Sequence, residues 1–164
     1  FQSTLDCVAE FANDSAYTFQ YSPRYGTPAA LLAEQIAPEV MTERFARLVE
    51  LQNANALKAN EQRVGQTFEV LLEGCSDHRP DMFTGRASDN HLINFSISPR
   101  QREALGVAAL DDRALGQLLE GSFARVTVTQ ARTFSLVGEW QQLTRSAASA
   151  VAQTGQPANG NNPA

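Results

Sequence analysis

The fold prediction starts from residues 83–95, which read Phe-Thr-Gly-Arg-Ala-Ser-Asp-Asn-His-Leu-Ile-Asn-Phe. Two short apolar runs flank a polar centre, in which Asp89 and Asn90 tolerate the left-handed backbone that a tight hairpin turn requires. The second run nearly alternates between apolar and polar residues as far as Ile97, which is typical of a strand with one buried face. We therefore expect a hairpin in the middle of a small β-barrel, with a polar face compatible with nucleic acid.

The same alternation sorts the side chains of the hairpin into two sets. Ile93, Phe95 and Ile97 should lie in the core, because they share one face of the second strand. The polar side chains expected in solvent are Arg86, Asn90, His91 and Asn94.

Beyond Val64, further strand-like runs separated by turn residues predict a small closed or nearly closed barrel of the OB-like kind. The five runs are residues 67–73, 82–87, 91–97, 123–131 and 135–140. Residues 98–121 are rich in Ala, Leu, Arg and Gln, which predicts a helical insertion of one or two short helices between the third and fourth strands. The fold class is thus α+β, and the barrel should span residues 64–143.

The first part of the chain has a different pattern. Residues 1–38 begin with an amphipathic helical run, and residues 16–21 then alternate with aromatic side chains, as a short strand should. A helix followed by a strand with nothing earlier to pair with indicates the last repeat of a larger α/β domain. Residues 39–63 predict a connector helix, opened by Pro38 at a tolerated first-turn position.

The loop that follows the predicted strand is a candidate binding segment. Open α/β and barrel folds bind ligands at the carboxyl ends of their strands, and Arg24 lies just beyond such an end. The alternative is a structural turn in which prolines restrict the unfolded chain.

The composition of the chain limits the functions that it can have. The chain of 164 residues carries a net charge of −5, so any RNA contact has to rely on a local cluster of basic residues. No apolar run is long enough to span a membrane, no secretory signal is present, and the start resembles a cut from a longer polypeptide. Cys7 and Cys75 are isolated, which excludes a zinc or complete iron–sulfur site and favours a reducing cytoplasm. Residues 144–164 predict a disordered tail.

No local motif indicates an autonomous active site, since the carboxylates are scattered and His78 and His91 are the only histidines. RNA binding has more support, because amide, basic and aromatic side chains on β-surfaces commonly read single-stranded RNA. The candidates are Arg63, Arg79, Arg86, Asn90, His91, Asn94, Arg125 and Arg132, with Phe83 and Phe134 as stacking surfaces. The alternative is that these are ordinary solvated strand positions and core phenylalanines.

Two groups of residues resemble a known family. Residues 16–24 and 26–30 resemble the end of the radical S-adenosylmethionine domain of the methylthiotransferases. The family's C-terminal TRAM domain is matched by Val64-Gly65, residues 70–74, Gly85-Arg86, Asn90, Asn94-Phe95, Gly121, Val126 and residues 136–138. The resemblance covers the chain apart from the insertion and the tail, and it is closest to the tRNA-modifying branch.

The resemblance implies a parent enzyme that replaces a hydrogen on an isopentenylated adenosine beside the tRNA anticodon with a methylthio group. The parent uses two 4Fe-4S clusters and S-adenosylmethionine, which carry the hard chemistry. This chain would hold no catalytic residue, cofactor or metal of its own. Its part would be the last strand of a truncated radical SAM barrel, the connector helix and a TRAM barrel that docks the anticodon stem-loop of tRNA.

Further expectations follow from the same resemblance. Tyr21, Ser22 and Arg24 are carried over as a wall of the S-adenosylmethionine pocket. The partners would be tRNA and the N-terminal and radical SAM domains of the same protein, in a monomer with no membrane contact. Two departures from the family pattern are Tyr25, where proline is commoner, and the insertion, which is longer than usual and acidic.

A second hypothesis remains open. The barrel would then be a protein-interaction or stabilising module, as in the branch that modifies a ribosomal protein. The distribution of arginines separates the two, because clustering on one face favours RNA and scatter favours a protein partner.

Overall fold

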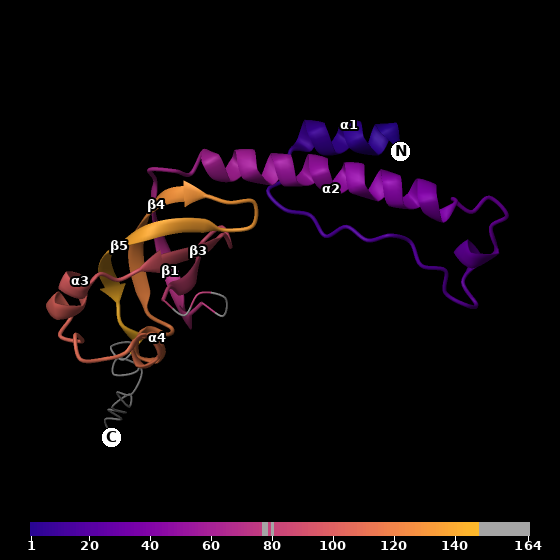
Figure 1. The fold of residues 1–164 in the computed structure, drawn as a ribbon. Helices are drawn as coiled ribbons and strands as arrows, with labels where there is room; N and C mark the ends of the chain where they lie inside the picture. The colour runs from indigo at the N-terminus through magenta and orange to yellow at the C-terminus, as the bar shows by residue number, and fades with distance from the viewer. Residues whose placement is uncertain (77–78, 80, 148–164) are drawn as a thin grey trace, which may run out of the picture. The chain divides into compact units, whose positions relative to one another are not determined.

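The computed structural model describes residues 1–76, 79 and 81–147, and the chain divides into two compact units, Phe1–Gln62 and Arg63–Ala164 (Figure 1). Most of the predicted tail and His78 lie outside the described residues. Within the part of the chain that the structure describes, no helix combines the length and apolarity needed to cross a lipid bilayer.

The first unit consists of helices and extended chain. Helix α1 spans Gln2–Phe11, a 3-10 turn spans Pro28–Leu31, and α2 spans Pro38–Glu61. Helix α2 begins with Pro38 at a first-turn position, followed by acidic Glu39 near the positive end of the helix dipole. The connector helix predicted over residues 39–63 therefore forms.

Helices α1 and α2 are tied together by side-chain amides. Gln52 donates through Nε2 to the Asn13 carbonyl at 2.8 Å, and Asn55 donates through Nδ2 to the Val8 carbonyl at 3.0 Å. The Val8 carbonyl also accepts from the Ala12 N–H at the end of α1, and Asn13 follows the helix, so the two amides attach α2 to the end of α1 and to the chain just beyond it. The polar half of α2 is therefore used for packing on α1.

The strand predicted over residues 16–21 does not form. This segment has no ladder partner among the described residues, and Tyr17 and Phe19 remain 94% and 84% exposed. A strand exists only where a neighbouring strand takes up its backbone hydrogen bonds. The aromatic alternation thus identified a segment with the composition of a strand, but no partner strand pairs with it among the described residues.

The second unit is a closed five-stranded barrel, which confirms the predicted α+β class. The strands are β1 (Thr67–Cys75), β2 (Phe83–Ala87), β3 (Leu92–Ser96), β4 (Phe123–Ala131) and β5 (Leu136–Arg145). Their order around the barrel is β1-β2-β3-β5-β4, and β3 with β5 is the parallel pair. This closed mixed barrel fits the OB-like expectation, and β5 runs beyond the predicted end at Trp140.

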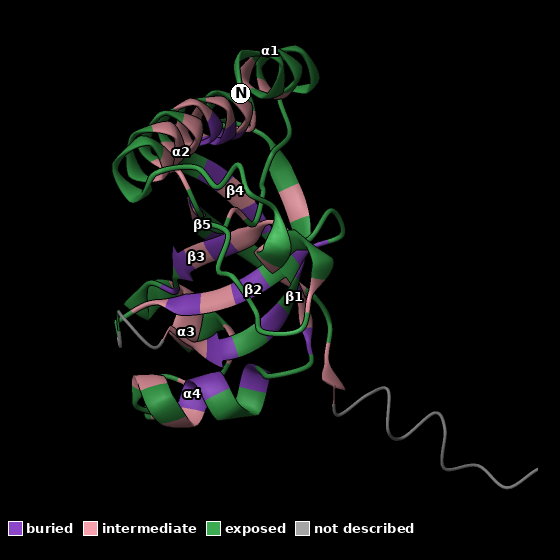
Figure 2. Cartoon of the chain, turned by 90° about the vertical axis from the view of Figure 1, so that its right-hand side faces the viewer, coloured by how far each residue is buried: buried purple, intermediate pink, exposed green. Residues whose placement is uncertain are grey.

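Alternating side chains of the strands form the core of the barrel, as the colours of Figure 2 show along β2 and β3. Ile93 and Phe95 are fully buried. Phe83 stacks on Phe95 with ring centroids 5.9 Å apart. The Trp140 ring also contacts Phe95, with a centroid separation of 5.9 Å. The proposed RNA-stacking role of Phe83 is therefore wrong, since its side chain is 2% exposed.

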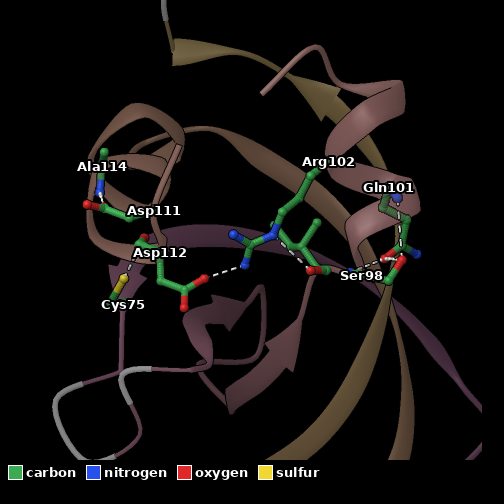
Figure 3. Close-up of polar contacts among 8 residues, drawn as sticks. Cys75, Ser98, Gln101, Arg102, Asp111, Asp112 and Ala114 are labelled. Atoms are coloured by element: carbon green, nitrogen blue, oxygen red, sulfur yellow. Dashed lines mark hydrogen bonds and ion pairs between the residues drawn. The ribbon is translucent and has the colours of Figure 1, made fainter. Parts of the chain in front are cut away.

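The insertion forms two helices, α3 (Pro99–Ala104) and α4 (Asp112–Leu119), as predicted. Ser98 and Gln101 form a capping box at the start of α3, and Asp111 caps α4 by accepting from the Ala114 N–H at 2.7 Å. Arg102 joins the two helices, because its guanidinium pairs with Asp112 and donates through Nε to the Ile97 carbonyl at 3.1 Å (Figure 3).

Candidate nucleic-acid interface

Arg86 lies on the outer face of β2, near the turn that leads into β3. Its Nε lies 3.1 Å from Oε1 of Glu73 on β1, so the two side chains form an ion pair between neighbouring strands. Its Nη1 donates to Asn90, at 3.3 Å from the backbone carbonyl and 3.4 Å from Oδ1. Asn90 accepts these bonds from a left-handed backbone with φ of 67°, as predicted for the turn.

A second polar group forms around Asp89 in the same turn. The His91 ring nitrogen Nδ1 lies 3.0 Å from Asp89 Oδ2, and the His91 backbone N–H donates to Asp89 Oδ1 at 3.3 Å. Arg63 contributes Nη2 at 3.5 Å from Asp89 Oδ2. Partial burial raises the pKa of Asp89, but the hydrogen bonds from His91 and the charge of Arg63 outweigh it, so this pKa lies below its usual value.

Strand pairing places the remaining β3 candidate on the same outer face. Asn94 lies opposite Thr84 of β2 and beside Val137 of β5, and Arg86 lies opposite Leu92. The outer surface of β2 and β3 is the part of an OB-fold that binds oligonucleotides. Arg86 and Asn94 thus share the outer surface of β2 and β3, and Asn90 contacts Arg86 from the adjoining turn.

The other arginines lie elsewhere on the barrel. Arg79 follows the far end of β1 and pairs with Asp81 at 2.8 Å, while Arg125 lies on β4 opposite Glu69. Arg132 lies in the β4–β5 turn, next to Phe134, which is 78% exposed. Since Ile93 pairs with Leu136, this turn lies at the same end of the barrel as the β2–β3 turn. The structure therefore brings Arg63, Arg86 and Arg132 to one end and separates Arg79 and Arg125 from them.

Carboxylates balance the basic charge of the barrel. The sequence of the second unit contains nine arginines and ten aspartates or glutamates. Arg63, Arg79 and Arg86 each face a carboxylate at 3.5 Å or less. A phosphate would have to compete with these partners, so the surface differs from a dedicated phosphate-binding stripe. Glu73 was not singled out by the sequence, because its proximity to Arg86 depends on strand register.

Of the three residues predicted to form a wall of the S-adenosylmethionine pocket, one lines a cavity in the first unit. Tyr21 lines a cavity of about 720 Å³ together with Phe19, Met41, Phe45 and Leu48, whereas Ser22 and Arg24 are not among its lining residues. On the α2 side, Met41, Phe45 and Leu48 recur at helical spacing, and this spacing is the sequence signal for that wall of the cavity.

Neither cysteine belongs to a ligand set. Among the described residues, no group of three or more His, Cys, Asp or Glu side chains could hold a metal ion. Cys7 is exposed, and Cys75 donates through Sγ to the Asp112 carbonyl at 3.0 Å. Burial raises the pKa of the Cys75 thiol, and the negative charge of Asp112 raises it further. Cys75 is thus a protonated structural thiol between β1 and α4.

The fold defines the class of protein: a helical unit joined to a small OB-like barrel with a polar turn between β2 and β3. No protein-family model matches the chain. It is 42% identical over 139 residues to the tRNA-2-methylthio-N(6)-dimethylallyladenosine synthase of Moorella thermoacetica, covering 85% of this chain and 27% of that protein. The synthases of Bacillus cytotoxicus and Mycobacterium sp. (strain MCS) are each 40% identical over 85% and 88% of this chain.

The resemblance to the methylthiotransferase family is therefore confirmed, with the tRNA-modifying synthases as the matching branch. The barrel is consistent with the TRAM domain of that family. The chain spans about a quarter of the length of the curated relatives it matches.

Proposed function

We propose that this chain is the tRNA-docking part of a radical S-adenosylmethionine methylthiotransferase. The whole enzyme would add a methylthio group to an isopentenylated adenosine next to the tRNA anticodon, in the cytoplasm and as a monomer. The similarity to synthases named for this tRNA product supports the reaction. The single observation that carries the docking role is the group formed by Arg86, Asn90 and Asn94 on the β2–β3 face of an OB-like barrel.

The cofactors belong to other parts of the enzyme in this proposal. The two cysteines lie in different units and outside any ligand cluster among the described residues, so they do not fit a 4Fe-4S site. The two clusters and S-adenosylmethionine would supply the radical chemistry. Tyr21 would contribute an aromatic wall to the S-adenosylmethionine pocket, with Ser22 and Arg24 beside it in the loop.

The second candidate function is a protein-binding or stabilising barrel, as in a methylthiotransferase that acts on a ribosomal protein. The observation that favours it is the balance of charge, since three barrel arginines already face carboxylates. Electrostatic attraction for an RNA backbone would then be weak over most of the surface.

The test is an NMR titration of this chain with a tRNA anticodon stem-loop at two salt concentrations. We expect salt-sensitive shifts at Arg86, Asn90, His91 and Asn94. Arg86→Ala should weaken binding. Arg100→Ala is the control, because Arg100 is an exposed arginine of α3, beyond the opposite end of β3, and its loss should leave the affinity for the stem-loop unchanged. Absence of shifts at low salt and high RNA concentration would show that this chain does not bind the stem-loop on its own, and would favour the protein-binding candidate.

A further inference from the structure

The guanidinium of Arg86 is held from two sides. Glu73 contacts Nε at 3.1 Å, and Asn90 accepts from Nη1 at 3.3 and 3.4 Å. Nη2 makes no hydrogen bond within the described part of the chain. The two contacts fix the plane of the guanidinium and leave one amino group, with two hydrogens, for an external acceptor.

Irregular backbone places both of these partners. Leu72 pairs with Gly85 and Gly74 pairs with Thr84, so Glu73 is the extra residue of a β-bulge in β1. Gly74 follows with φ of 103°, and Asn90 has φ of 67°. Bulges commonly redirect a side chain next to a functional site. Both departures from regular strand geometry thus direct acceptors at the same arginine.

Stability alone does not account for this arrangement. The side chains of Arg86 and Glu73 are 43% and 38% exposed, and ion pairs with this exposure contribute little to folding because water and salt screen them. A fixed guanidinium is more useful in recognition, since less side-chain entropy is lost when an acceptor binds to it.

We propose that Glu73 is a positioning residue for RNA docking, which together with Asn90 holds Arg86 so that its Nη2 group meets an acceptor oxygen of the RNA. This inference rests on the proposed docking function. The expected effect of losing Glu73 on the affinity for RNA is opposite to the usual effect of losing a negative charge. Removing a negative charge from an RNA-binding surface ordinarily tightens binding, whereas loss of Glu73 should weaken it.

The experiment measures binding of the anticodon stem-loop to the whole chain and to four variants: Glu73→Gln, Glu139→Gln, Arg86→Ala and the Arg86→Ala/Glu73→Gln double variant. Glu73→Gln should weaken binding about two- to fivefold, the range expected for losing one exposed charged contact. Glu139→Gln is the matched control, because it removes the same charge from an exposed position on β5 without touching Arg86; its affinity should stay equal or rise. In an Arg86→Ala background, Glu73→Gln should no longer weaken binding.

A second measurement follows the Arg86 Nε–H resonance in the free protein. It should be protected from exchange in the wild type and lose protection in Glu73→Gln. Tighter binding by Glu73→Gln, or equal weakening with and without Arg86, would overturn the positioning role while the docking function stands. Failure of the wild-type chain to bind the stem-loop would overturn both.

Discussion

Gly85 is a position in β2 that has no room for a side chain against β1. A Cβ at this position would collide with the Leu71 carbonyl oxygen and come within 2.6 Å of Val70 Cγ1. Because one of these neighbours is backbone in a paired strand, neither strand can yield without losing register. Gly85→Ala should therefore lower the free energy of unfolding by about 1–3 kcal/mol, the usual cost of overpacking a core.

Urea unfolding of the Gly85→Ala variant provides the measurement, with Thr84→Ala as the control. Thr84 is the neighbour of Gly85 on the outer, half-buried side of β2, so its truncation should cost less. Equal stabilities of the two variants would show that β1 and β2 can separate at this point.

Asp89 gives the barrel a pH-dependent contribution to stability. Its pKa is lower in the folded protein than its usual value of 3.8, so the ionised carboxylate stabilises the fold above that pH. The difference in unfolding free energy between wild type and Asp89→Asn should be full above about pH 4 and vanish as pH falls through the lowered pKa. A difference that stays constant from neutral to strongly acidic pH would refute this role.

For single residues, the alternation of apolar and polar positions predicted which side chains are buried, but it did not predict which side chains contact one another. The period of two correctly placed Ile93, Phe95 and Ile97 in the core. It did not pair Glu73 with Arg86, because their contact depends on a bulge that shifts the register by one residue. Phe83 was equally compatible with a surface and a core role, and only closure of the barrel selects the core.

The side chain of Arg102 is one of the contacts that attach the insertion to the barrel. Arg102 donates to the Ile97 carbonyl and pairs with Asp112 of α4 (Figure 3). Its guanidinium carbon also lies over the Phe83 ring, 5.8 Å from the ring centroid. Arg102→Ala should destabilise the barrel unit by about 1–3 kcal/mol, since it removes charge-assisted hydrogen bonds in a half-buried setting. Chemical denaturation measures the loss.

Arg100→Ala is the matched control for Arg102→Ala, because Arg100 is an exposed arginine of the same short helix. Its effect should stay within about 0.5 kcal/mol, as for most surface substitutions. If both variants were equally stable, packing of α4 on β1 alone would hold the insertion in place.

The elements themselves were largely predictable from local pattern. Five strands, the connector helix and the helical insertion follow from periodicity and composition, whereas the caps formed by Ser98 and Asp111 became evident only in the structure. Residues 16–21 are the exception, because strand formation is a property of a pair of segments rather than of one. Periodicity reports which residues could be buried, and it carries no information on whether a partner strand is present.

At the scale of the whole chain, burial is distributed unevenly between the units. The second unit holds nearly all of the buried apolar side chains, whereas in the first unit Ala56 is the only buried hydrophobic residue among those described. Phe11, Tyr17 and Phe19 leave large apolar surfaces in contact with water. Apolar patches of this kind mark surfaces that bind other protein segments. This agrees with the expectation from the family resemblance that the N-terminal and radical SAM domains are partners of this chain.

The overall charge makes a prediction about how tRNA binding depends on salt. The chain has a net charge of −5, and the barrel contains fewer arginines than acidic residues. With only Arg86 and its neighbours at one end engaged, the slope of log affinity against log salt should be about −1 to −2, since each neutralised phosphate contributes somewhat less than one unit. Titrations of the anticodon stem-loop across a series of salt concentrations measure this slope. A slope steeper than about −4 would require phosphate contacts over a much larger surface, and would contradict docking through a small group of side chains on the β2–β3 face.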